Sequence, residues 1–116
     1  MVRRRRRAVL CGYRLMWLMV MFDLPVDTEE ERKLANGFRK LLLDFGFERC
    51  QYSVYLRFCE SRQQVETWVR RIGARVPKGG KVYCLAFTDK QYEGLVRFEN
   101  RIPLPPPENP TQFRLF

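Results

Sequence analysis

Residues 15–25 read "LMWLMVMFDLP", eight consecutive apolar residues followed by an aspartate and, two positions later, a proline. A short, continuous apolar run that ends at a turn signal favours a buried β-strand over a helix. The run does not alternate between apolar and polar residues, as a strand with one face in water would. Both faces of this strand are therefore predicted to be covered.

The segment after this strand predicts a helix over residues 28–46. Thr28 and Glu31 have the spacing of a capping box, and Gly46 stands where a helix commonly ends. Apolar residues recur at helical spacing and define the predicted inward face: Leu34, Phe38, Leu41, Leu42 and Phe45.

The following segments predict two short strands, a second helix and a fourth strand. Residues 47–58, "FERCQYSVYLRF", are rich in strand-forming residues, with a reversal expected near residues 51–53. Residues 81–88, "KVYCLAFT", again lack alternation, and residues 89–102 stay open between a short helix and a loop. A second capping box, Ser61 with Gln64, predicts the start of a helix whose inward face carries Val65, Trp68, Val69 and Ile72.

The element order β-α-β-β-α-β predicts an α+β, ferredoxin-like fold, with one antiparallel sheet and both helices on one face. We divide the chain into a basic N-terminal arm (1–13), the ferredoxin-like domain (14–102) and a proline-rich linker with a C-terminal strand, "TQFRLF" (103–116). Because the second face of the sheet is also apolar, we expect a homodimer packed sheet to sheet. The C-terminal strand is then expected to join the edge of the partner subunit's sheet.

The net charge of +9 favours a polyanionic partner, and +4 remains when the five arginines of residues 3–7 are set aside. A solvated surface would carry the same residue types, so the helix charges alone do not decide between binding and solubility. The candidate phosphate contacts are Arg14, Arg32, Arg39, Arg49 and Arg57.

The cysteines do not predict a metal site, because the chain has no histidine and its four cysteines lie far apart. Cys50, Cys59 and Cys84 fall in strand-like runs and are predicted to be buried, which suits a reducing cytoplasm. The apolar run at residues 15–22 is too short to span a bilayer as a helix. We therefore expect a cytoplasmic protein with no membrane partner.

Asp23 is the candidate catalytic and metal-binding residue. An aspartate before Leu-Pro also suits an ordinary turn, in which the side chain bonds nearby backbone. A two-fold axis near Asp23 would instead bring two carboxylates to one Mg²⁺, an ion that takes few protein ligands and keeps several waters. Such an ion activates water and stabilises charge on a phosphodiester.

Three motifs in order, "MFDLP" (21–25), "GFERCQYSVYLRF" (46–58) and "TDKQY" (88–92), make the chain resemble the CRISPR-associated protein 2 family, especially its type II form, over about residues 14–96. The resemblance implies a ferredoxin-like homodimer that bridges dimers of the integrase, CRISPR-associated protein 1, and binds double-stranded DNA during spacer acquisition. It also implies a Mg²⁺-dependent endonuclease acting on RNA or DNA, with Asp23 as the metal ligand shared across the dimer.

The chain departs from that family at Phe22, where many members have tyrosine, so any role for that hydroxyl is absent. Tyr52 and Ser53 match the family pattern and are expected to shape the strand reversal. Two other interpretations stay open: a free-standing ribonuclease resembling the VapD-like toxins, and an RNA-binding module of the RRM type. Single-stranded RNA stays open as a second nucleic-acid partner beside double-stranded DNA.

Overall fold

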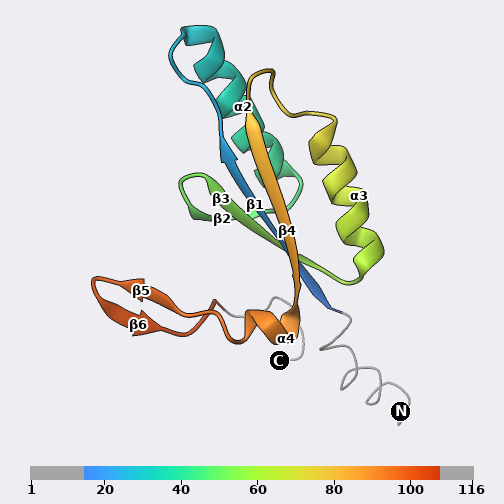
Figure 1. Cartoon of the computed structure of the whole chain (residues 1–116), viewed down its shortest axis with the longest axis vertical. Coiled ribbons are helices and arrows are strands. Elements are labelled where there is room, and N and C mark those ends of the chain that lie inside the picture. Colours follow the sequence, from blue (N-terminus) through green and yellow to red (C-terminus); the bar gives the residue numbers. More distant parts are fainter. Residues whose placement is uncertain (1–14, 108–116) are drawn as a thin grey trace.

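The computed structural model describes residues 15–107, and its element order confirms the predicted β-α-β-β-α-β arrangement (Figure 1). The first six elements are β1 (Met16–Asp23), α2 (Glu29–Asp44), β2 (Glu48–Gln51), β3 (Val54–Cys59), α3 (Arg62–Gly73) and β4 (Lys81–Thr88). A short helix and a hairpin follow: α4 (Asp89–Tyr92), β5 (Arg97–Glu99) and β6 (Ile102–Leu104).

Strand β1 lies inside a four-stranded antiparallel sheet of order β2-β3-β1-β4, paired with β3 on one side and β4 on the other. The apolar run does not alternate because apolar side chains of β1 pack on both faces of the sheet, the even-numbered ones in the main core and Trp17 and Met19 in a second cluster. The fold is the predicted α+β, ferredoxin-like one, with β2 and β4 as the two edges of the sheet.

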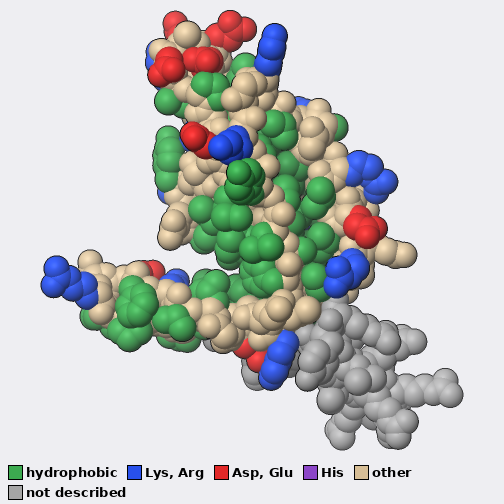
Figure 2. All heavy atoms as spheres, in the orientation of Figure 1, with side chains coloured by type: hydrophobic (Ala, Val, Ile, Leu, Met, Phe, Trp, Pro, Cys, Tyr) green, Lys and Arg blue, Asp and Glu red, His purple; other side chains and the backbone are tan. Residues whose placement is uncertain are grey.

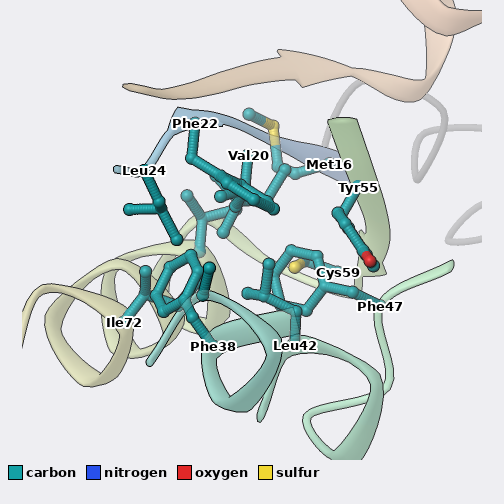
Figure 3. Close-up of a cluster of buried hydrophobic side chains, with 13 residues drawn as sticks. Met16, Val20, Phe22, Leu24, Phe38, Leu42, Phe47, Tyr55, Cys59 and Ile72 are labelled. Carbon is teal, nitrogen blue, oxygen red and sulfur yellow. The ribbon is translucent and has the colours of Figure 1, made fainter. Parts of the chain in front are cut away.

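The main core forms where one face of β1 meets both helices. Figure 3 shows Val20 and Phe22 of β1 facing Phe38 and Leu42 of α2, with Ile72 of α3 beside them. Phe22 packs edge to face on Phe38, with ring centroids 5.2 Å apart. The even-numbered residues of β1 therefore belong to the helix-covered face, and the odd-numbered residues belong to the second face.

Helix α2 begins as predicted, and four of the five residues predicted to face inward do so, with Phe38 and Leu42 buried and Leu41 and Phe45 packed against the core. Thr28 and Glu31 form the complete capping box, and Gly46 adopts a positive φ of 88° just beyond the helix. The prediction for Leu34 was wrong, because its side chain is 48% exposed and Ala35 is buried in its place. The inward stripe runs through Ala35, Phe38 and Leu42, and Leu34 lies about 100° around the helix from Ala35.

Helix α3 differs from the prediction at two positions. The Ser61 hydroxyl accepts from the Gln64 backbone N–H, but the Gln64 side chain accepts from the N–H of Glu60 instead of completing the capping box. Val69 is exposed, whereas Val65 and Ile72 are buried as predicted. The exposed Val69 leaves a narrower apolar stripe on α3 than its spacing indicated.

Of the three described cysteines, Cys59 alone is buried, so the prediction was wrong for Cys50 and Cys84. Cys50 lies on β2 and Cys84 on β4, which are the edge strands of the sheet. Edge strands are covered less than central ones, and strand-like composition alone does not reveal which position a strand will take.

The second face of the sheet is partly covered by the chain's own residues 89–95. The ring of Tyr92 stacks on Trp17 at a centroid distance of 4.0 Å, and the buried carboxylate of Asp89 accepts a 2.8 Å hydrogen bond from Trp17 Nε1. Leu95 packs against the buried cluster of Trp17, Leu56 and Tyr92. The motif "TDKQY" thus anchors α4 across one end of this face.

Residues 97–104 form a hairpin that projects from the sheet (Figure 1). Residues 97–102 of this hairpin were left open between helix and loop, and residues 103–104 were placed in the linker. Its turn places Asn100 and Arg101 at positive φ values of 53° and 67°. Two positive φ values in succession match the twist of a tight hairpin. Phe98 and Ile102 are exposed on this hairpin.

We expect the free energy of unfolding to fall as the pH rises from 10 to 12, through Tyr92. Burial raises the pKa of Tyr92 from 10.0 to about 12, and its hydroxyl donates to the Pro107 carbonyl at 2.9 Å. Between these pH values the unfolded chain loses the proton that the folded chain keeps, so unfolding is favoured. Denaturant titrations across this range should show that the wild type loses stability relative to Tyr92→Phe. A constant difference between the two would contradict this assignment.

Candidate functional site

Asp23 is the last residue of β1, and its side chain is exposed. The unbroken register with β4 pairs Asp23 with Lys81, and alternation puts both on the second face together with Met19 and Met21. Within residues 15–107 the Asp23 carboxylate makes neither a hydrogen bond nor an ion pair. The aspartate is thus presented to the surface rather than used in the turn that follows it.

Asp23 borders an apolar area that we call the second-face patch. Hydrophobic side chains gather over the middle of the sheet, above the projecting hairpin (Figure 2). Residues 89–95 leave this part of the face uncovered, with two half-buried methionines and two exposed residues of β4. The second-face patch consists of Met19, Met21, Tyr83 and Leu85.

One copy of the chain supplies a single carboxylate at this place. Among the described residues, no three side chains of histidine, cysteine, aspartate or glutamate are grouped closely enough to hold a metal ion. A carboxylate oxygen is the ligand type that Mg²⁺ prefers. The donor therefore fits Mg²⁺ in kind, and one copy offers it this single carboxylate among the described residues.

Phe22 and Asp23 point to opposite faces of the sheet. Phe22 is buried on the helix side, where it contacts Phe38 and stacks near Tyr55. A tyrosine at this position would carry its hydroxyl into the helix-side core instead of toward the Asp23 carboxylate. The phenylalanine here therefore removes no group from the Asp23 side of the sheet.

The turn between β2 and β3 lies against the end of β1. The Phe22 N–H donates to the Ser53 carbonyl at 3.1 Å, and the predicted reversal at residues 51–53 is confirmed. The guanidinium of Arg39, from α2, lies 4.5 Å from the centroid of the Tyr52 ring and 5.5 Å from that of Phe22. Arg39 thus lies beside the strand that ends at Asp23.

The other predicted phosphate contacts do not gather around Asp23. Arg57 lies on the helix side, where its Nε donates to the Phe45 carbonyl at 2.8 Å and its Nη1 to the Phe58 carbonyl at 2.7 Å. Arg32 donates to carbonyls of the loop after β1, and Arg49 is exposed on β2. Arg14 lies outside the described residues.

Helix α3 carries a basic surface that the list of predicted contacts omitted. Glu66 is the only acidic residue of α3, whereas the acids of α2 are as many as its basic residues. The two ion pairs found among residues 15–107 lie in or near α4 and the hairpin, away from α3. The exposed basic residues on and just after α3 are Arg62, Arg70, Arg71 and Arg75.

Together these features define a small ferredoxin-like protein with a strand-end carboxylate beside an apolar sheet face. The family model described as CRISPR associated protein Cas2 matches residues 16–94. The chain belongs to this family, which confirms the resemblance drawn from the three motifs.

Curated relatives extend over nearly the whole chain. A protein of Paracidovorax avenae is 56% identical over 108 residues, covering 93% of this chain and 100% of its own. Relatives from Flavobacterium psychrophilum and Parvibaculum lavamentivorans are 42% and 44% identical, covering 90% and 87% of this chain and 90% and 100% of their own. All three relatives are named CRISPR-associated endoribonuclease Cas2.

None of the helices in residues 15–107 combines the length and the apolar character needed to cross a membrane.

Proposed function

We propose that the chain is a CRISPR adaptation protein that forms a homodimer, bridges dimers of the integrase and binds double-stranded DNA during spacer acquisition. We further propose a Mg²⁺-dependent phosphodiesterase site on the dimer axis, with Asp23 from both copies. The observation that carries this proposal is the exposed carboxylate of Asp23 at the border of the uncovered second-face patch. Family membership favours this function over the RRM-type alternative.

The second-face patch supports a dimer because residues 89–95 leave its apolar side chains uncovered. In a two-fold interface the same surface serves both copies, so a residue near the axis meets its own symmetry mate. Asp23 borders the patch without lying at its centre, which lets the apolar residues pack while the carboxylates stay hydrated. The open edge of β4 offers the partner's C-terminal strand a place to pair.

In the proposed site, different residues of the chain bind the metal ion and the phosphodiester. Bound Mg²⁺ supplies activation of a water molecule and stabilisation of negative charge. Asp23 from each copy would hold the ion, and Lys81, beside Asp23 in the register, would attract the phosphodiester into the site.

Duplex DNA is assigned to a different surface from the cleaved strand. The exposed arginines of α3 lie on the helix side of the sheet, whereas Asp23 lies on the second face. The relatives' name, endoribonuclease, supports RNA as the substrate at Asp23, and we propose that the cleaved RNA is single-stranded. Integration assays with the partner integrase test the first role, and cleavage by the protein alone tests the second.

Leu85→Arg is expected to convert the dimer to a monomer, because it places a charge in the middle of an apolar interface. Cleavage of single-stranded RNA in Mg²⁺ should be lost at the same time, since each copy holds only one carboxylate. Light scattering coupled to gel filtration measures the mass, and a labelled RNA measures the cleavage. The wild type should stop cleaving when a chelator removes the metal.

Leu43→Arg is the matched control, because Leu43 on α2 and Leu85 on β4 are each 53% exposed. Leu43 lies on a helix away from the second-face patch, so this variant should remain a dimer and keep its activity. A monomeric wild type would exclude the proposed dimer, and a monomer that still cleaves would exclude a site shared between copies.

A further inference from the structure

We propose that Tyr52 and Arg39 form a nucleobase-stacking site that positions a single-stranded nucleic acid next to Asp23. The inference rests on the proposed function, because it names how that site would hold its substrate. From the sequence, Tyr52 was expected only to shape the strand reversal. In the structure, the guanidinium of Arg39 also lies over one face of the Tyr52 ring.

The Tyr52 ring is held in place and yet open to solvent. Its side chain is 68% exposed in the turn between β2 and β3, although the Arg39 guanidinium lies 4.5 Å from its centroid. A packing role would bury the ring, as it does for Tyr55 two residues from the turn. An exposed ring held by an arginine is instead a platform on which a base can stack.

Arg39 is directed at aromatic rings rather than at acidic side chains. Its Nη1 donates to the Asn36 side chain at 3.3 Å, and within residues 15–107 it has no ion pair. Its Nε is buried and lacks a hydrogen-bond partner among these residues. Its guanidinium also approaches Phe22 at 5.5 Å, so the cation is fixed between two rings while its charge stays uncompensated.

The stacking site and the carboxylate are linked through the backbone. Ser53, which follows Tyr52, accepts the hydrogen bond of Phe22, which precedes Asp23. This backbone bond puts Tyr52 at the same end of β1 as Asp23. Arg39 reaches the Tyr52 ring from the helix side, whereas Asp23 faces the other side of the sheet, so a strand stacked on Tyr52 passes around the end of β1 to reach Asp23. Duplex DNA keeps its bases stacked inside the helix, so the ligand class is a single strand with an unpaired base.

The test measures stacking without cleavage. A short single-stranded RNA carrying one 2-aminopurine is titrated with the full chain in a chelator, and quenching of the fluorescent base reports stacking. We expect wild type and Tyr52→Phe to quench it, and Tyr52→Ala to bind about 10-fold more weakly with little quenching. Arg39→Lys, which keeps the charge but loses the planar group, should show an intermediate effect. The same titration with DNA reports which sugar is preferred.

Phe98→Ala is the matched control, since Phe98 is 67% exposed but lies on the distant hairpin. It should bind like the wild type. Unchanged quenching in Tyr52→Ala, or no quenching by the wild type, would overturn the stacking site even if Asp23 proves catalytic. Conversion of Tyr52→Ala to a monomer would also overturn it, because the ring would then be a contact between copies. If Asp23 proves inactive, quenching lost in Tyr52→Ala still supports the stacking site as a binding feature.

Discussion

Asp23→Asn is expected to reduce Mg²⁺-dependent cleavage of single-stranded RNA by at least about 100-fold. Mutation of a residue that only orients a metal ligand lowers metal affinity or activity by about 10- to 100-fold. Asp23→Asn removes the charge of the proposed ligand itself, and in the dimer it does so in both copies at once. The amide keeps the size of the side chain, so the fold and the dimer should persist. Initial cleavage rates at increasing Mg²⁺ separate weaker metal binding from a slower reaction.

Asp27→Asn makes the same chemical change four residues further on, at another exposed aspartate. It should cleave RNA at the wild-type rate, which shows that the loss at Asp23 does not come from the change in net charge. Spacer integration with the partner integrase should be measured for both variants. Undiminished cleavage by Asp23→Asn would remove this residue from the catalytic site, whatever the outcome for integration.

Leu18→Ala is expected to lower the free energy of unfolding by about 2–5 kcal/mol, a large fraction of the about 5–15 kcal/mol typical of a domain. Leu18 is 0% exposed at the centre of β1, where the sheet and both helices leave little freedom to fill the resulting cavity. Denaturant titration at one fixed protein concentration measures the change, since dimerisation adds to the stability.

Leu34→Ala supplies the comparison for Leu18, because Leu34 is 48% exposed on α2. Its replacement should change the free energy of unfolding by no more than about 0.5 kcal/mol. Equal losses in the two variants would mean that β1 is not the centre of the core.

Local signals in the sequence predicted most of the fold. The capping box of Thr28 and Glu31 marks a helix start within four residues, and the apolar run of β1 needed only its own composition to indicate a buried strand. The exposure of Leu34 was not predictable in this way, because it depends on how α2 rotates against the sheet.

Contacts between residues far apart in the chain are the part of the site that the sequence did not predict. Alternation along β1 predicts that Asp23 shares a face with Met19 and Met21. Because both faces of the run are apolar, it does not predict which face the helices cover. In contrast, the hydrogen bond from Trp17 to Asp89 joins residues 72 positions apart, and no local sequence pattern predicted it. The bond from Arg57 to the Phe45 carbonyl likewise arises where β3 passes the end of α2, so the internal role of Arg57 was missed.

Because Phe22 and Asp23 point to opposite faces of β1, selection for folding and selection for activity act on different residues of the same strand. In a complete mutational scan, substitutions at Val20 and Phe22 should lower the amount of folded protein in the cell, since these side chains fill the core. Substitutions at Asp23 should spare abundance and alter activity alone. Neighbouring codons can therefore evolve almost independently, and drift in the core residues need not disturb the chemistry one position away.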